Sequence, residues 1–119
     1  MEWKLTDDRP IWLQLAEQLT RRIITGVYPP GSKLPPVREL AAEAGVNPNT
    51  MQRALAQLEQ DGLAKADRTA GRMVTQDTGV LDRVRGEQAK VVIDQYFNAM
   101  AELGYSRTQA AALLEEEIP

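Results

Sequence analysis

The sequence of 119 residues predicts a mainly α-helical fold with one small β-hairpin. The first observation is a helical spacing of apolar residues in several separate segments, most of which end at a glycine. The second is a pair of short strand-like segments between residues 63 and 75, joined by a turn. The third is composition. Without cysteine or histidine the chain has no disulfide framework, no thiol site and no imidazole base or metal ligand.

The first expected helix begins at Pro10 and ends at Gly26. Proline suits the first helical position, because its missing N–H has no helical partner there. An apolar stripe follows at helical spacing, formed by Ile11, Trp12, Leu15, Leu19 and Ile23. We expect Trp12 to lie in the core among these aliphatic neighbours, in preference to the alternative of a ligand-stacking platform. Trp3 lies in a short extended stretch and is expected to pack against this part of the chain or a partner subunit.

Two further helices are expected, from Val37 to Ala44 and from Pro48 to Asp61. Gly45 suits the tight turn between them, and Asn47 is a good N-cap for the second. The apolar stripe of the second helix consists of Met51, Ala54, Leu55 and Leu58. The opposite face is mostly polar and carries Asn49, Arg53, Ala56 and Gln60, with Thr50 and Gln52 at its N-terminal end.

The hairpin is expected from Leu63 to Asp67 and from Gly71 to Thr75, with Arg68, Thr69 and Ala70 in the turn. Gly71 permits close approach of the backbone to a phosphate, and Arg68 and Arg72 are expected to bring positive charge to the tip. Helix, turn, helix and basic hairpin is the order of a winged helix-turn-helix, which places its second helix in the DNA major groove. Each residue taken alone fits an ordinary solvated surface, but their ordered combination favours DNA binding.

The polar side chains of the second helix suit contacts to DNA. Arginine and glutamine, here Arg53 and Gln52, form bidentate hydrogen bonds to guanine and adenine respectively. Thr50 is placed to donate to a phosphate near the positive end of the helix. The chain carries a net charge of -3, and its acidity lies mainly after residue 79. Phosphate contacts are therefore expected from a local cluster only, formed by Lys33, Arg38, Arg53, Lys65, Arg68 and Arg72.

The segment from Arg9 to Thr75 resembles the DNA-binding domain of GntR-type bacterial transcription regulators. The resemblance is carried by Pro10-Ile11-Trp12-x-Gln14, Pro30-Gly31-x-Lys33-Leu34-Pro35, Arg38-Glu39-Leu40-Ala41 and Gly45-Val46-Asn47-Pro48-Asn49-Thr50. It implies DNA contacts at Arg38, at Asn47, Pro48, Asn49 and Thr50, at Gln52 or Arg53, and at the wing around Gly71. Pro36 replaces a usual capping serine, Met73 a frequent aromatic, and Asn47-Pro48 a common Ser-Arg pair. Asn-Pro-Asn-Thr followed by Gln-Arg is similar to the YtrA-like branch.

The remaining forty residues predict two helices. A long helical pattern runs from Val80 to Leu103 and stops at Gly104, and Ser106 with Gln109 forms a capping box for a last helix. Such a tail is too small for an effector domain with its own core. The expected organisation is a winged helix-turn-helix at 1–75, a hinge at 76–79 and a dimerisation tail at 80–119. The residues expected to pair subunits are Leu81, Val84, Val91, Val92, Tyr96, Ala99, Leu103, Leu114 and Ile118.

We therefore expect a cytoplasmic, homodimeric regulator that binds double-stranded operator DNA with inverted-repeat symmetry and represses transcription. No catalytic residues, cofactor or metal site are expected. The acidic run Glu115-Glu116-Glu117 points in different directions along a helix and indicates a solvated end. One alternative is a ligand-gated version with a small effector between the tail helices, for which Tyr96, Tyr105 and Arg107 are the only candidates. Another is a winged helix that serves protein contacts alone.

Overall fold

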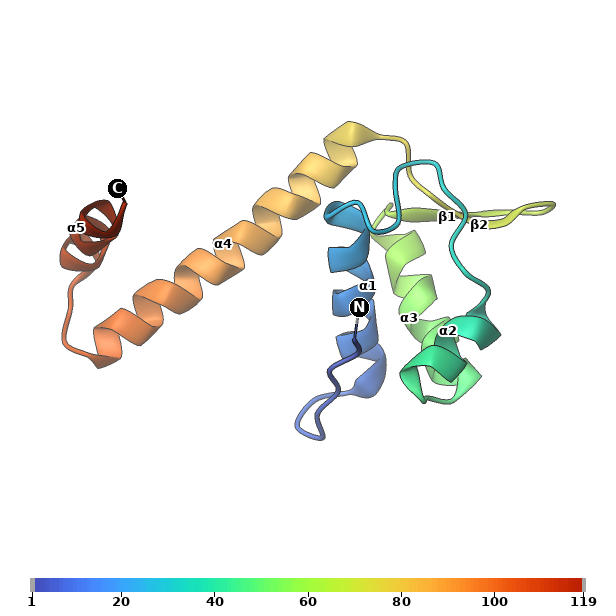
Figure 1. Cartoon of the computed structure of the whole chain (residues 1–119), viewed down its shortest axis with the longest axis horizontal. Coiled ribbons are helices and arrows are strands. Elements are labelled where there is room, and N and C mark those ends of the chain that lie inside the picture. The colour runs from blue at the N-terminus through green and yellow to red at the C-terminus, as the bar shows by residue number, and fades with distance from the viewer. Residues whose placement is uncertain (1, 119) are drawn as a thin grey trace. The chain divides into compact units, whose positions relative to one another are not determined.

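The computed structural model describes residues 2–118 (Figure 1). The elements follow the order α1 (Ile11–Ile24), α2 (Val37–Ala44), α3 (Pro48–Gln60), β1 (Ala64–Asp67), β2 (Gly71–Val74), α4 (Thr78–Glu102) and α5 (Arg107–Glu117). The chain divides into two compact units, one up to Arg83 and one from Val84 onward. We call the first unit the head and the second the tail.

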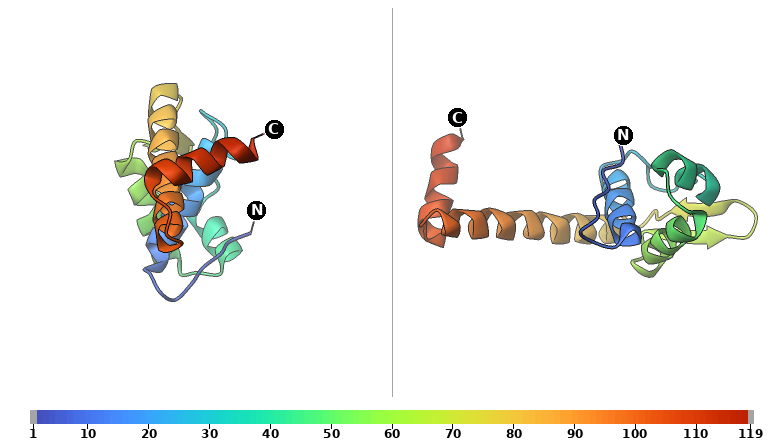
Figure 2. Two further views of the ribbon diagram at one scale, coloured as in Figure 1. Left: turned by 90° about the vertical axis from the view of Figure 1, so that its left-hand side faces the viewer. Right: turned by 90° about the horizontal axis from the view of Figure 1, so that it is seen from below.

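The head is built around α3, which packs against both α1 and α2. Figure 2 shows these three helices grouped together, with the hairpin of β1 and β2 projecting from them. The core consists of fully buried apolar side chains contributed by α1, α2 and α3, by the loop before α2 and by the loop between α3 and β1. Its largest members are Leu15, Leu19, Ile23, Leu34, Leu40, Met51, Leu55, Leu58 and Leu63. The apolar stripes expected for α1 and α3 therefore supply most of this core.

Local signals set the ends of α2 and α3. Gly45 ends α2 in the left-handed conformation, with φ of 71°. The side chain of Asn47 accepts a hydrogen bond from the backbone N–H of Asn49 at 2.7 Å, and Pro48 occupies the first turn. The expected caps are thus confirmed. A proline at the N-cap of α2, Pro36, leaves that helix without a side-chain cap.

The hairpin gains a third extended segment that the sequence did not indicate. β1 and β2 pair antiparallel, with Ala64 opposite Val74 and Asp67 opposite Gly71. Along the other edge of β2, Lys33 forms an antiparallel bridge with Met73. The N–H of Leu34 donates to the carbonyl of Arg72 at 2.9 Å. The loop before α2 is thereby fixed to the base of the wing.

The N-terminal arm, residues 2–9, is bound to α1 by two glutamine side chains. The amide of Gln14 accepts from the N–H of Thr6 at 2.8 Å and donates to the carbonyl of Thr6 at 2.9 Å. One turn later, the amide of Gln18 exchanges the same pair of bonds with the backbone of Lys4, at 3.0 and 2.7 Å. Because a side-chain amide has the same donor and acceptor as a peptide, each glutamine substitutes for one residue of a neighbouring strand.

Trp3 packs against the head, one of the two positions expected for it. Its ring lies under the guanidinium of Arg22, whose Cζ is 4.0 Å from the ring centroid. Its indole N–H donates to Oε1 of Glu43 at 3.1 Å, and the same oxygen accepts from Arg22 at 3.1 Å. Arg22 also donates to the Tyr28 hydroxyl at 2.8 Å. The arm, α1 and α2 therefore meet at one polar cluster.

Helix α4 begins at Thr78, two residues before its expected start. The cause is the Asp77 carboxylate, which accepts from the N–H of Gly79 at 2.9 Å and of Val80 at 3.3 Å. Two residues of the segment 76–79 are therefore helical, and the hinge expected there stays a prediction. Of the residues that the structure describes, none belongs to a helix long and apolar enough to cross a membrane.

In the tail, α5 is held to the second half of α4 by specific contacts. The hydroxyl of Tyr96 donates to the carbonyl of Ala110 at 2.7 Å, and Ala110 is fully buried. The guanidinium of Arg107 lies 4.1 Å from the ring centroid of Phe97. The capping box of Ser106 and Gln109 forms as expected, with both reciprocal hydrogen bonds present.

Two residues expected on the dimerisation surface are not available there. Leu81 and Val84 are each 6% exposed, so their side chains are already covered within the single chain. The helical pattern could not distinguish them from the exposed apolar residues further along α4, because both groups follow the same spacing. Tyr96 likewise packs within the tail through its bond to Ala110.

Candidate nucleic-acid interface

Helix α3 presents a polar surface on the side away from the core. Asn49, Gln52 and Arg53 are exposed, whereas Thr50 is half-buried. The first N–H groups of a helix lack helical partners and carry partial positive charge, so the Pro48 end of α3 attracts phosphate. Asn47 satisfies one of these groups through its side-chain oxygen, which gives this residue a structural role as well. The arrangement suits a helix that inserts its N-terminal half into a DNA groove.

Arg38 extends the same kind of surface onto α2. It lies in the first turn of that helix, and its side chain is exposed. An exposed arginine two residues inside a helix suits a phosphate contact, because its charge adds to that of the helix end.

The tip of the wing is shaped by Asp67. Its carboxylate accepts from the N–H of Thr69 at 2.8 Å, from the Thr69 hydroxyl at 2.9 Å and from the N–H of Ala70 at 3.1 Å. The backbone bond from Thr69 is the main cause that lowers the pKa of Asp67, followed by the hydroxyl bond. The Thr69 side chain therefore stabilises the turn, and the exposed Arg68 carries the charge of the tip.

Lys33 reaches the wing from the loop before α2. Gly71 has φ of +84°, and a Cβ atom at this position would lie 3.3 Å from Cε of Lys33. Glycine is therefore required at the start of β2 by backbone conformation, and its small size also leaves room for the lysine stem. The pairing of the loop with β2 explains how a residue far from the hairpin in sequence contributes charge to it.

Arg72 does not bring an unpaired charge to the wing tip, contrary to the expectation from the sequence. Its Nε lies 2.5 Å from Oε1 of Glu59 on α3, and its side chain is half-buried. The charge of Arg72 is thus balanced by a carboxylate, and the ion pair joins the wing to the second half of α3. Sequence reasoning missed Glu59, because the spacing along α3 gave no indication of what lies across from it in the hairpin.

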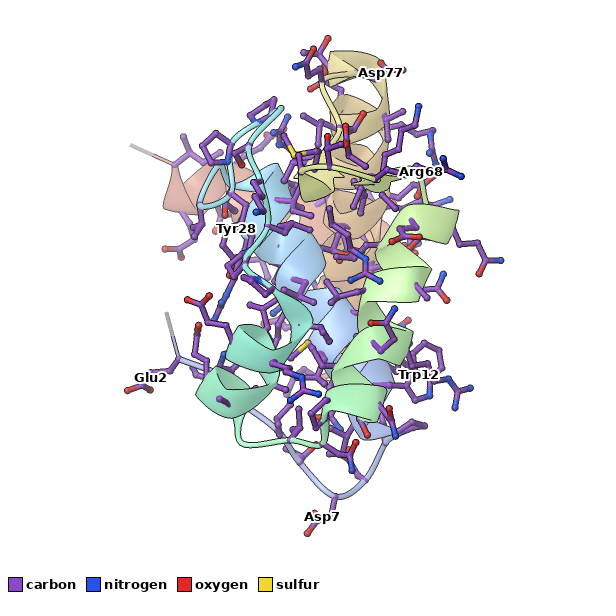
Figure 3. All side chains as sticks on the ribbon, turned by 90° about the vertical axis from the view of Figure 1, so that its right-hand side faces the viewer. Glu2, Asp7, Trp12, Tyr28, Arg68 and Asp77 are labelled. Atoms are coloured by element: carbon purple, nitrogen blue, oxygen red, sulfur yellow. The ribbon has the colours of Figure 1, made fainter. Side chains whose placement is uncertain are left out.

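Arg53 also has a neighbour that the sequence did not indicate. Its Cζ lies 4.2 Å from the centroid of the Trp12 ring. Trp12 is half-buried rather than in the core, at the edge of α3 that faces away from α2 (Figure 3). The expectation of a core tryptophan was wrong because the ring uses one face to carry a cation.

The candidates for an effector site have other contacts. Tyr96 is bonded to Ala110 and Arg107 stacks on Phe97, so each has a role in holding α5 to α4. Tyr105 lies in the loop between the two helices and is 41% exposed. Between residues 2 and 118, the structure holds no cluster of acidic side chains with the geometry of a metal site.

Comparison with known proteins identifies the family. Residues 12–74 match the bacterial regulatory proteins of the gntR family. The chain is 31% identical over 109 residues to the transcriptional regulator YhcF of Bacillus subtilis, covering 92% of this chain and 90% of YhcF. It is 30% identical over 94 residues to the transcriptional repressor YtrA of the same organism, covering 74% of this chain and 72% of YtrA.

A solved structure agrees with this assignment. A GntR family transcriptional regulator from Listeria monocytogenes superposes with a TM-score of 0.84 at 32% identity, covering 96% of this chain and all of the other. The expected winged helix-turn-helix fold is thereby confirmed, as is the expectation of a regulator and not an enzyme. The chain belongs to the GntR family of bacterial DNA-binding transcription regulators, with YtrA among its relatives.

Proposed function

We propose that this regulator is a repressor that binds as a homodimer to an operator with inverted-repeat symmetry. The observation that carries the DNA contact is the exposed polar N-terminal half of α3, next to a wing with Arg68 at its tip. Its chemistry suits base edges and phosphates together. Repression is supported by the similarity to YtrA, which is itself a transcriptional repressor. The protein then acts in the cytoplasm, where the chromosome lies.

In this proposal the DNA-contacting residues have distinct tasks. Asn49, Gln52 and Arg53 face base edges in the major groove. Arg38, Thr50 and Lys33 contact phosphates, together with the backbone at Asn47 and Pro48. At the wing, Arg68 and the backbone at Gly71 approach the adjacent backbone or minor groove. Thr69 and Arg72 contribute through the turn and the ion pair that fix the wing.

The dimer is supported by exposed apolar side chains of the tail. Val91, Val92, Ile93, Leu103, Leu114 and Ile118 each expose about half or more of their surface. Burying these exposed apolar surfaces in two subunits is worth roughly 10–20 kcal/mol before the costs of association. Association itself costs about 4–15 kcal/mol, so a micromolar dimer is within reach only if most of this surface is used. Ala99, also exposed, completes the surface that we assign to pairing.

Selection from a randomised duplex library tests the DNA proposal. The wild-type protein should enrich an inverted repeat whose half-sites lie about one helical turn, 34–36 Å, apart or at a multiple of that distance. Gln52→Ala should weaken binding to the enriched duplex by about 5- to 150-fold, because a bidentate base contact is worth about 1–3 kcal/mol.

A matched control is available on the same helix. Gln60 is exposed at the C-terminal end of α3, away from the end that reaches base edges. Gln60→Ala should therefore leave affinity unchanged. Equal effects of the two substitutions, or the enrichment of no sequence at all, would contradict the proposed reading helix. Repression is tested with a promoter that contains the enriched repeat. This promoter should be less active in cells that express the wild-type protein than in cells without it. In cells that express Gln52→Ala it should be more active than with the wild type.

A further inference from the structure

The contact between Trp12 and Arg53 links the supporting helix α1 to the proposed DNA surface of α3. The arginine side chain is exposed and crosses from α3 to the ring on α1. Within the described part of the chain, no carboxylate pairs with this guanidinium. Its hydrogen-bonding groups are therefore available to a ligand.

A second stack in the same head has a different character. Arg22 also lies over an indole ring, that of Trp3, at 4.0 Å. There the arginine is buried, with 3% of its surface exposed, and its N–H groups bind Glu43 and Tyr28. That stack is a structural cluster. The Arg53 contact has a similar distance, 4.2 Å from Cζ to the ring centroid, but its side chain is exposed.

Stacking determines which way an arginine can bind. A guanidinium uses the face of its plane against an aromatic ring, while its five N–H donors lie in the plane and point outward. The ring therefore does not compete with a hydrogen-bond acceptor. It also restricts a long flexible side chain before binding, which removes part of the entropy cost of ordering it on DNA.

We propose that Trp12 is a positioning residue for DNA recognition, which rests on the DNA-binding function proposed above. The Trp12 ring stays stacked on Arg53 in the complex and presents the guanidinium edge to a base or phosphate. Specificity then depends in part on a residue of α1 that does not itself touch DNA.

A double-mutant cycle in DNA binding tests the proposal, with the duplex enriched by the wild-type protein as probe. Trp12→Leu removes the aromatic face and keeps an apolar side chain, and Arg53→Met removes the charge and keeps the stem. Trp12→Leu should weaken binding by about 2- to 10-fold in the wild-type background, the range expected of a cation–π contact. It should have no effect in the Arg53→Met background. Trp12→Phe, which keeps an aromatic face, should restore most of the loss.

Trp3→Leu is the matched control. It removes the other contact between a tryptophan and an arginine, which involves no residue proposed to touch DNA. The affinity of the folded protein for the duplex should therefore be unchanged. Equal losses from Trp12→Leu in both backgrounds would mean that the ring acts only through general stability, and the proposal would be wrong. No loss from Trp12→Leu in the wild-type background would also refute the proposal, because the ring would then have no role in binding. Failure of the wild type to enrich any duplex would instead refute the DNA-binding function itself.

Fluorescence gives a second measurement that does not depend on the fold tolerating leucine at position 12. In a Trp3→Phe protein, Trp12 is the sole tryptophan. Its emission should differ between the Arg53 and Arg53→Met forms, both in the absence and in the presence of the duplex. If the duplex makes the two spectra identical, Arg53 has left the ring on binding, and the positioning role is refuted.

Discussion

Replacing Val92 with aspartate is expected to separate the proposed dimer into monomers. Val92 is 61% exposed in the single chain. Burying the exposed part of Val92 in the dimer contributes about 1–2 kcal/mol per subunit, since full burial of a valine is worth about 1.5–3 kcal/mol. Two-fold symmetry doubles the loss, and each aspartate would also bury an unpaired charge. The total is at least about 4 kcal/mol, which raises the dimer Kd by about a thousandfold.

Sedimentation velocity across micromolar concentrations measures this effect directly. The wild type should sediment as a dimer and Val92→Asp as a monomer. The control is Ala101→Asp, since Ala101 is exposed and nine residues further along α4, which places it half a turn away from Val92 on the opposite side of the helix. It adds the same charge to the same helix and should leave the dimer intact. A wild-type monomer at these concentrations, or equal behaviour of the two variants, would refute the assignment of the interface.

Three further predictions follow from the contacts described. Glu59→Gln should leave the charge of Arg72 unpaired and available to a phosphate. Binding to scrambled duplexes should then strengthen, and the slope of log K against log salt should steepen by up to about 0.9. An unchanged slope would show that Arg72 cannot reach DNA. The pKa of Asp67 is lowered in the folded protein. The stability that its carboxylate gives to the wing is therefore complete above the pKa of the unfolded state and is lost as pH falls through the lower pKa of the folded state. The protection of the Thr69 amide against hydrogen exchange, measured by NMR relative to the intrinsic rate at each pH, should accordingly fall in acid for the wild type but show no such transition in Asp67→Asn. Ser106→Ala should destabilise α5 by about 1 kcal/mol through loss of the capping box, visible as reduced helicity on heating; equal melting curves would contradict a stabilising cap.

Features that depend on neighbouring residues could be predicted from the sequence. The start of α3 and the end of α2 follow from Asn47 with Pro48 and from Gly45, whose effects are exerted on adjacent backbone. Pro10 is the N-cap of α1, one residue before the first helical position expected for it. Helix α4 begins two residues before the start of its apolar pattern, because the Asp77 carboxylate caps it.

Features that depend on distant residues could not be predicted. The pairing of Lys33 with Met73 joins segments forty residues apart, and no local pattern specifies it. The partners of Arg53 and Arg72 depend on where long, flexible side chains meet another element, which periodicity does not determine. The role of Gln14 was missed for a similar reason, because its partner is backbone and not a side chain.

The shared carboxylate of Glu43 has a consequence for how the head opens. One oxygen accepts from both Trp3 and Arg22, so the arm, α1 and α2 hold one another at a single acceptor. Native proteins open locally in cooperative units with their own free energies. Loss of the arm from its place therefore removes a restraint on the C-terminal end of α2, where Glu43 lies, and that end of the helix is expected to open together with the arm. The most peripheral segment of the head thereby sets how often this end of α2 opens.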